Sequence, residues 1–263
     1  MSLREKYGPW AVITGGSEGV GAAFARKLAD AGINLVLVAR KPSPLAALKH
    51  ELRNKVQVRT LSADLIRPDA FDAIAKATKD IEIGLLICNA GAEHGMHRFL
   101  DGPASDALNI ARLNVEVPLS FCHHFGLSMR TRKRGGILLV SSMAGYVGGP
   151  GIASYSGAKA FMRIFAEALW YELKPFSVDV LCLVLGATRT PAMERAGMNV
   201  VPGVEPAEPD MVAQEGLDRL AHGPVHCANN GAEAAQMMAS APRAELIAQI
   251  DQVTQALFAK RSS

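Results

Sequence analysis

Short apolar runs alternate with amphipathic stretches along most of the chain. The apolar runs predict buried strands at Trp10–Thr14, Asn34–Ala39, 56–60, Gly84–Cys88, Ile137–Ser141, Val178–Leu185 and 224–227. Apolar spacings of three and four residues predict helices at Ala22–Ala31, 43–53, 69–79, 104–134, 153–174, 210–222, 231–240 and 243–260. Repeated strand–helix units favour a parallel sheet with right-handed crossovers. The pattern therefore predicts an α/β fold, a doubly wound parallel sheet of about seven strands in a single domain spanning residues 1–263.

The first predicted strand runs into a glycine-rich turn just before the first long helix. The turn reads Thr14-Gly15-Gly16-Ser17-Glu18-Gly19-Val20-Gly21. Small residues there let backbone N–H groups approach a phosphate, and the helix N-terminus adds partial positive charge. A glycine cluster can also be a simple tight turn. Its position between a strand and an amphipathic helix favours a dinucleotide site.

The end of the second strand bears on the choice of cofactor. Arg40 and Lys41 stand where a site for NAD usually has an acid that binds the ribose 2′-hydroxyl. Arg40 can instead pair with a 2′-phosphate, so we expect NADP(H) rather than NAD(H). The alternative is that Arg40 merely begins a solvated loop. The carboxylate of Glu18 in the glycine turn argues against NADP(H), because it would repel the phosphate.

Further polar residues follow other strands at the same predicted sheet edge. Asp64 comes just after the third strand and can accept a hydrogen bond from an adenine amino group, or can simply cap its loop. The turns at 15–21, 40–41, 62–64 and 89–91 all lie at carboxyl ends of strands, where ligands bind in such sheets. Ser142, after the fifth strand, is expected at this edge too.

The predicted helix 153–174 carries a candidate proton-transfer pair. Tyr155 and Lys159 are four residues apart, which places them on one face of a helix. A close positive charge favours the phenolate, so the pair can exchange a proton near neutral pH. The same spacing also occurs by chance on ordinary surface helices, and its meaning depends on what surrounds it.

A proline inside the predicted helix 104–134 frees a backbone carbonyl. Pro118 has no N–H, so the carbonyl of Asn114 loses its usual partner four residues on. We expect this carbonyl to bind a water near Lys159.

Composition narrows the remaining classes of function. The 263 residues carry a net charge of +3, which indicates no bulk field for nucleic acid or membrane. The chain shows no signal-peptide pattern and no run long enough to span a bilayer. Its scattered cysteines predict reduced thiols and a cytoplasmic location. The cations at 130–134 are better explained by a helix C-terminus than by a nucleic-acid patch.

Two loops are also expected near the pocket. Residues 191–210, rich in Pro, Gly and Met, predict a flap over the substrate. Glu93, His94, His97 and Asp101 form a loop at the pocket mouth, and we predict no metal there.

Taken together and in order, these motifs resemble the classical short-chain dehydrogenase/reductase family over roughly residues 8–228. The matching pieces are Thr14-Gly15-x-x-x-Gly19-x-Gly21, Asp64, Asn89-Ala90-Gly91, Asn114, Ser142, Tyr155-x-x-x-Lys159, and Gly186 with Thr190. The resemblance implies a Rossmann-type domain that oxidises alcohols or reduces carbonyls with a nicotinamide cofactor. Two departures are Cys88 in place of a frequent Asn and Leu185 in place of the usual Pro before Gly186, which alters the wall of the nicotinamide pocket.

The same resemblance assigns roles to the matching residues. It implies that Tyr155 gives or takes the proton and that Ser142 holds the carbonyl oxygen. It implies that Lys159 lowers the pKa of Tyr155 and binds the nicotinamide ribose, and that Asn114 supports a proton-relay water. Thr190 would bind the carboxamide. The implied cofactor contacts are Gly15, Ser17, Glu18, Gly19, Val20, Gly21, Arg40, Asp64, Asn89, Ala90, Gly91, Tyr155, Lys159, Gly186, Thr188 and Thr190.

We therefore predict an NADP(H)-dependent oxidoreductase that interconverts a carbonyl and a secondary alcohol on a mostly apolar small molecule, without a metal. Candidate pocket residues are Met96, Met143, Tyr146, Met193 and Met198. The alternative is a non-catalytic dinucleotide-binding sensor, against which the intact Ser142, Tyr155 and Lys159 argue. The resemblance also implies a homodimer or homotetramer formed through the helices at 104–134 and 153–174.

Overall fold

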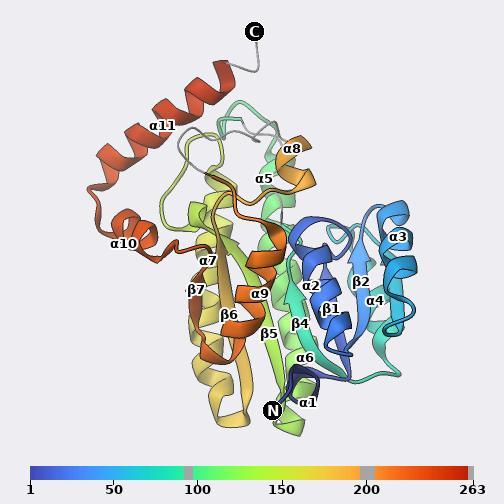
Figure 1. Cartoon of the computed structure of the whole chain (residues 1–263). Helices are drawn as coiled ribbons and strands as arrows, with labels where there is room; N and C mark the ends of the chain where they lie inside the picture. The colour runs from blue at the N-terminus through green and yellow to red at the C-terminus, as the bar shows by residue number, and fades with distance from the viewer. Residues whose placement is uncertain (92–96, 196–204, 260–263) are drawn as a thin grey trace.

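The centre of the molecule is one parallel sheet. The computed structural model describes residues 1–91, 97–195 and 205–259. Its seven strands lie in the order β3-β2-β1-β4-β5-β6-β7, and every neighbouring pair is parallel (Figure 1). The strands are β1 Trp10–Thr14, β2 Asn34–Ala39, β3 Val58–Ser62, β4 Ile83–Cys88, β5 Gly135–Ser142, β6 Val178–Leu185 and β7 Val225–Cys227. The predicted α/β fold with seven strands is confirmed.

Helices cover both faces of the sheet and create two cores. One face packs against α2 (Gly19–Asp30), α3 (Pro42–Leu52) and α9 (Pro209–Arg219). The other packs against α4 (Ala70–Thr78), α6 (Val117–Arg132) and α7 (Ala153–Leu173). Successive strand residues alternate between the cores, with Ile13 in the first and Val12 in the second. Because both faces are covered, the five inner strands β2, β1, β4, β5 and β6 are nearly continuous apolar runs, which is why they could be predicted.

The remaining helices lie at the ends and edges of the sheet. They are α1 (Leu3–Tyr7), α5 (Ala104–Ala111), α8 (Pro191–Arg195), α10 (Ala232–Ser240) and α11 (Arg243–Ala259). Figure 1 shows α10 beside the β7 edge and α11 projecting away from the body of the domain. Among the described residues, no helix is long and apolar enough to cross a membrane.

The predicted helix 104–134 is wrong as a single helix. It consists of α5, a π-helical turn at Arg112–Glu116, and α6. The N–H of Val117 donates to the carbonyl of Arg112, five residues earlier. Pro118 in the first turn of α6 has no N–H to donate, so regular α-helical bonding cannot pass through this point.

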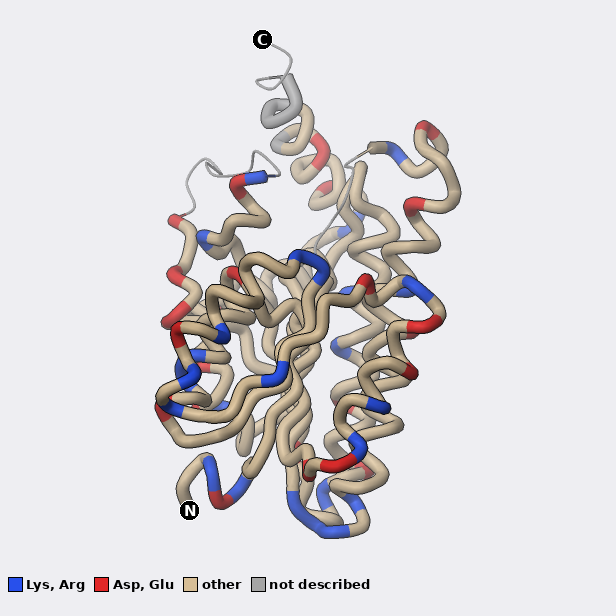
Figure 2. Tube along the Cα trace, turned by 90° about the vertical axis from the view of Figure 1, so that its right-hand side faces the viewer, with Lys and Arg blue, Asp and Glu red and all other residues tan. Residues whose placement is uncertain are grey.

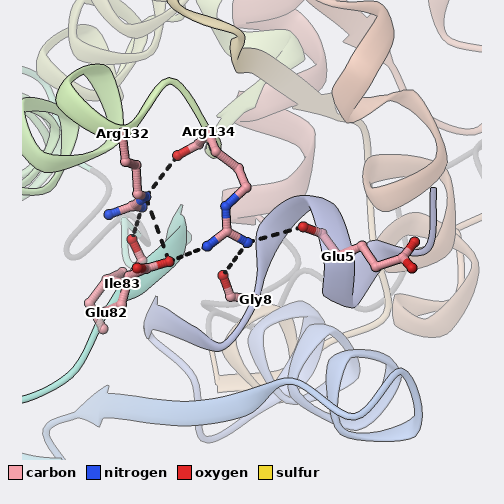
Figure 3. Close-up of polar contacts among 6 residues, drawn as sticks. All are labelled: Glu5, Gly8, Glu82, Ile83, Arg132 and Arg134. Carbon is pink, nitrogen blue, oxygen red and sulfur yellow. Dashed lines mark hydrogen bonds and ion pairs between the residues drawn. The ribbon is translucent and has the colours of Figure 1, made fainter.

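The cations at the end of α6 bind backbone of the same chain (Figure 3). The Arg134 guanidinium donates to the carbonyls of Glu5 and Gly8, at 3.0 and 3.3 Å, and pairs with the carboxylate of Glu82. Arg132 donates to the carbonyls of Arg134 and Ile83. These contacts tie α1 and the start of β4 to the end of α6, which favours the structural interpretation of this basic segment. Elsewhere charges of both signs are interspersed along the chain (Figure 2).

Candidate active site

The glycine turn lies at the carboxyl end of β1 and leads directly into α2. The helix begins at Gly19, three residues earlier than predicted. Gly15 and Gly19 have φ of 65° and 54°, a left-handed conformation that side chains other than glycine strain to adopt. A Cβ atom at Gly21 would lie 2.1 Å from the carbonyl oxygen of Gly15. The turn is therefore folded too tightly for any other residue at position 21, and it presents backbone rather than side chains.

Asn89 and Thr14 hold this turn against the end of β4. The Asn89 side-chain amide donates to the carbonyls of Thr14 and Gly15, at 3.2 and 3.1 Å. The Thr14 hydroxyl in turn accepts from the backbone N–H groups of Asn89 and Ala90, at 3.1 and 3.2 Å. Sequence reasoning did not assign this function to Thr14, although a hydroxyl at the end of an apolar strand is a recognisable signal.

Two candidate residues, Asn114 and Lys159, meet beside a third, Gly91. A Cβ atom on Gly91 would lie 2.4 Å from Asn114 Oδ1 and 2.8 Å from Lys159 Nζ, so both side chains occupy the space that glycine leaves. The Asn114 amide nitrogen donates to the carbonyl of Ile110 at 3.0 Å. Its oxygen is buried and has no hydrogen-bond partner among the residues that the structure describes. A buried polar atom of this kind needs a donor from a ligand or from water.

Lys159 is a buried cation beside the ring of Tyr155. Its ammonium group donates to the carbonyl of Val140 at 3.0 Å, and the residue is only 3% exposed. Burial lowers the pKa of Lys159 to about 8, although the neighbouring thiols of Cys182 and Cys88 act to raise it. The ammonium nitrogen lies 5.5 Å from the centroid of the half-buried Tyr155 ring. The structure thus brings the two residues together as their spacing on α7 predicted.

Ser142 ends β5 and lies beside the end of β6, because it pairs with Leu185 in the sheet. Its hydroxyl accepts a hydrogen bond from the N–H of Ala144 at 3.2 Å, which caps the short 3-10 turn Met143–Gly145. The preceding Ser141 donates to the carbonyl of Lys159 at 2.9 Å and fixes α7 to this strand. The hydroxyl of Ser142 is thereby held at the carboxyl edge, where the sequence expected it.

The loop after β6 turns back toward the glycine turn. The Thr188 hydroxyl donates to the carbonyl of Gly186 at 3.2 Å, and the Thr190 hydroxyl accepts from the N–H of Met193 at 3.2 Å. A Cβ atom on Gly19 would lie 3.0 Å from the Thr190 methyl carbon. Thr190 is therefore packed against the start of α2. Residues 196–204 of the predicted flap lie outside the described residues.

The charges around the glycine turn differ from the simple sequence picture. The Glu18 carboxylate accepts from Arg195 at 2.7 Å and pairs with Lys41 at 3.5 Å. Burial acts to raise the pKa of Glu18, but the bonds and charges of Arg195 and Lys41 outweigh it, and the pKa is lowered. The guanidinium of Arg40 is exposed and forms no hydrogen bond or ion pair with any described residue. The repulsion expected from Glu18 is thus countered by two cations, one of which the sequence did not single out.

The other predicted contacts vary in what their side chains can do. Asp64 accepts from the N–H of Ile66 at 3.4 Å, which is the loop-cap arrangement considered as its alternative. Val20 is buried in the first core, so only its backbone can meet a ligand. Ser17 is half-buried in the turn.

The candidate metal set does not come together among the described residues. His97 pairs with Asp106 at 3.2 Å, while Glu93 and His94 lie outside the described ranges. No group of three His, Cys, Asp or Glu residues that could hold a metal occurs in the part of the chain that the structure describes. Met96 and Met198, expected to line the pocket, also lie outside it.

A shallow surface crevice, with an enclosed volume of only about 20 Å³, borders the start of α7. It is lined mainly by apolar residues from the loop before α5, from α5 itself and from residues 151–154. His97, Asp106 and Ser154 contribute its polar atoms. Because Ser154 is the residue before Tyr155, the crevice adjoins the first turn of α7.

A parallel sheet with a glycine turn and a buried lysine beside a half-buried tyrosine at its carboxyl edge is typical of nucleotide-binding α/β oxidoreductases. The family model "short chain dehydrogenase" matches residues 9–199. The chain belongs to the short-chain dehydrogenase family.

Similar proteins include several of this family. A 7beta-hydroxysteroid dehydrogenase of Mediterraneibacter gnavus is 33% identical over 230 residues, covering 84% of this chain and 86% of that one. A very-long-chain 3-oxoacyl-CoA reductase of Coprinopsis cinerea is 38% identical over 180 residues, covering 66% of this chain and 53% of that protein. A solved short-chain dehydrogenase from Sphingobium yanoikuyae, in complex with NADPH, is 29% identical with a TM-score of 0.78, covering 90% of this chain and 97% of that one.

Proposed function

We propose that this oxidoreductase uses NADP(H) to interconvert a carbonyl and a secondary alcohol on a bulky, mostly apolar small molecule. The single observation that carries the proposal is the buried ammonium of Lys159 beside the Tyr155 ring, in the corner that also holds Asn114. Among the described residues no carboxylate pairs with the Lys159 ammonium. Burying such a charge costs free energy, which is why the pKa of Lys159 is lowered to about 8, and a protein without a function at this site has little reason to bear that cost.

The residues present fit a dinucleotide. The left-handed glycine turn and the N-terminus of α2 present backbone N–H groups suited to a pyrophosphate, and the unpartnered Asn114 Oδ1 lies in the adjoining corner. The cofactor would be held by Gly15, Ser17, Glu18, Gly19, Val20, Gly21, Arg40, Asp64, Asn89, Ala90, Gly91, Tyr155, Lys159, Gly186, Thr188 and Thr190. When bound, the nicotinamide supplies or accepts the hydride.

The proton is moved by residues of this chain. In the reducing direction Tyr155 donates its phenolic proton to the substrate oxygen, and in the oxidising direction it accepts the proton. The charge of Lys159 stabilises the phenolate between these states. Ser142 donates a hydrogen bond to the same oxygen, where preorganised donors act most strongly on the transition state. Asn114 supports a water, bound at its backbone carbonyl beside Lys159, that returns the proton to solvent.

The preference for NADP(H) rests on the charges at the turn. Arg40 is exposed at the end of β2, and Glu18 is compensated by Lys41 and Arg195. The three cations and one carboxylate leave a local charge of +2, which favours the extra phosphate of NADP(H). The relative that was solved with NADPH is in line with this choice.

The proposal of a bulky apolar substrate rests on two supports. The crevice beside Ser154 includes Phe99, Ile110 and Ile152. The similar proteins named above are a 7beta-hydroxysteroid dehydrogenase and a very-long-chain 3-oxoacyl-CoA reductase, and a steroid and a very long acyl chain are both large apolar groups.

The test is a panel of ketones and alcohols, including steroids and 3-oxoacyl thioesters, assayed with NADPH and with NADH. Turnover is followed by the ultraviolet absorbance of the reduced nicotinamide. We expect turnover with at least one bulky ketone and faster turnover with NADPH. Tight cofactor binding without turnover of any compound would favour the non-catalytic sensor instead.

We also propose a homodimer or homotetramer in a cytoplasmic setting. Apolar side chains are exposed on the outer faces of two neighbouring helical segments, at Leu108, Leu119, Leu127, Phe161, Ile164 and Tyr171. Such a surface is typical of a contact between subunits. All four cysteines are free thiols, which supports a reducing compartment.

A further inference from the structure

The first turn of α8 lies across the glycine turn. A Cβ atom on Gly19 would lie 3.0 Å from the Thr190 methyl carbon and 3.9 Å from the Pro191 ring. The segment after β1 and the segment after β6 are therefore in contact at the carboxyl edge of the sheet. Arg195, the last residue of α8, donates a hydrogen bond to Glu18 in the glycine turn.

Glu18 connects this helix to the end of β2. One carboxylate oxygen accepts from the Arg195 guanidinium at 2.7 Å, and the other lies 3.5 Å from the Lys41 ammonium. Both oxygens are thus in use, and the carboxylate is held between two cations. A guanidinium has five N–H donors, and the bond to Glu18 comes from a single nitrogen, Nη2. Arg195 is half exposed, so its other donors can reach a ligand.

The charge balance suggests what that ligand is. A lone carboxylate in a phosphate-binding turn would weaken the site by repulsion. Here the bond to Arg195 brings in a cation that cancels this charge, and Lys41 and Arg40 nearby leave a net positive charge. A carboxylate that orders a guanidinium beside a phosphate site raises the affinity for phosphate more than a smaller neutral residue would. The reason is that the guanidinium is already ordered before the phosphate binds.

We infer that Arg195 is a further cofactor-binding residue that donates to a phosphate of NADP(H), and that Glu18 is the positioning residue that holds Arg195 over the glycine turn. The inference rests on the proposed function, since it requires that a dinucleotide binds here. If Arg195 binds a phosphate at the glycine turn after β1, the position of α8 depends on whether the cofactor is bound.

The first test compares Arg195→Ala with Arg189→Ala by calorimetric titration of NADPH and NADH. Arg189 is a matched control, because it lies on the same loop, is similarly exposed, and pairs with the Glu208 carboxylate at 2.7 Å. We expect Arg195→Ala to weaken NADPH binding about fivefold, as for a partly solvated charge-assisted hydrogen bond. Arg189→Ala should leave both dissociation constants unchanged.

The two cofactors distinguish which phosphate is bound. A loss confined to NADPH assigns Arg195 to the 2′-phosphate, and an equal loss for NADPH and NADH assigns it to the pyrophosphate. Unchanged binding of both cofactors would overturn the inference. If the wild type binds neither cofactor, the proposed function itself fails, which is a different result from a selective loss in the variant.

The second test asks whether Glu18 acts through Arg195. In the wild-type background Glu18→Gln should weaken NADPH binding about threefold, because Arg195 loses the charged partner that positions it. In the Arg195→Ala background the same substitution should strengthen binding, because it removes a carboxylate that then only repels the phosphate. A Glu18→Gln effect of the same sign and size in both backgrounds would contradict the positioning role. Circular dichroism checks that each variant is folded.

Discussion

The ammonium nitrogen of Lys159 lies 3.0 Å from the carbonyl oxygen of Val140, two residues before Ser142 on β5. Both residues are buried, so the charge is held by a backbone dipole instead of by water. The Val140 carbonyl and Ser142 belong to one strand, and the position of the Lys159 ammonium is therefore fixed relative to the Ser142 hydroxyl. Burying the Lys159 ammonium lowers the free energy of unfolding, and this decrease can be measured.

Lys159→Met should stabilise the protein near neutral pH while abolishing turnover. Burial lowers the pKa of Lys159 from 10.5 to about 8, so between these values the unfolded chain binds a proton that the folded chain does not. The stability of the wild type therefore rises with pH across this window, and the cost is fully present below pH 8. At 1.36 kcal/mol per unit, the cost is about 3 kcal/mol, less the lost hydrogen bond to Val140.

The measurement is urea unfolding of the wild type and Lys159→Met at pH 7 and pH 10. We expect the variant to be more stable at pH 7 and the difference to narrow at pH 10. Lys49→Met is the control, because Lys49 is exposed on α3 and should give a difference that does not change with pH. A difference that widens toward pH 10 would mean that the charged lysine stabilises the fold.

Tyr155→Phe should lower kcat about 10²- to 10⁴-fold, the usual loss when a general acid is removed. The dissociation constant of NADPH should change much less, since the ring is retained and only the hydroxyl is lost. Steady-state assay of the best ketone and calorimetric titration of NADPH measure the two effects. Tyr171→Phe on the same helix is the control, because Tyr171 is 72% exposed and has no proposed role in proton transfer. Equal activity of the two variants would remove Tyr155 from the mechanism.

Arg40→Ala should raise KM for NADPH about tenfold and leave KM for NADH nearly unchanged, because only NADPH has a 2′-phosphate to pair with the guanidinium. Initial rates at varied cofactor concentration give both constants. Arg53→Ala, at an exposed arginine just after α3, tests whether any surface cation has the same effect through the overall field. The preference for NADP(H) would have no support from Arg40 if both cofactors responded equally.

Gly91→Ala should disable the site by steric conflict. The added methyl group would lie 2.4 Å from Asn114 Oδ1 and 2.8 Å from Lys159 Nζ, which forces one or both side chains to move. We expect kcat to fall at least tenfold and the free energy of unfolding to fall by about 1–3 kcal/mol. Gly157→Ala is a demanding control, since position 157 lies between Tyr155 and Lys159 on α7 and a Cβ there meets nothing within 4 Å. That variant should be active and slightly more stable, by up to about 1 kcal/mol. Full activity of Gly91→Ala would show that Asn114 and Lys159 can move apart without loss.

The inner strands were the most predictable part of the fold, because they are buried on both faces and are nearly continuous apolar runs. Five of the seven strands match the structure within one residue at both ends, β5 begins two residues earlier than predicted, and β3 is displaced by two residues, from 56–60 to Val58–Ser62. The short helix α1 was missed, since five residues show no periodicity. It is stabilised by a capping box between Ser2 and Glu5 and by a hydrogen bond of 2.7 Å from Tyr7 to the distant Asp179.

The candidate site also has a part that the sequence predicted and a part that it did not. Tyr155 and Lys159 could be paired from the sequence because four residues are one helical turn, and Gly15, Gly19 and Gly21 because a tight turn requires them. The partnership of Glu18 with Arg195 could not, because 177 positions separate them and only the path of the chain after β6 brings them together. The buried environment that shifts the pKa of Lys159 is likewise a product of packing, which no local pattern encodes.

The π-helical turn at Arg112–Glu116 sets the direction in which Asn114 is aimed. Seven residues make almost two turns of regular helix, so an uninterrupted helix would place Asn114 on the same side as Phe121, which is packed under the sheet. The extra residue in the wide turn offsets the upstream half by about 100°, the rotation that one residue contributes. Deleting Val115 or Glu116, which lie between Asn114 and α6, should rotate Asn114 by about 100° relative to α6 and turn its side chain away from Lys159. The direction of the Asn114 side chain is therefore set by the number of residues in the helical turn as much as by their chemistry.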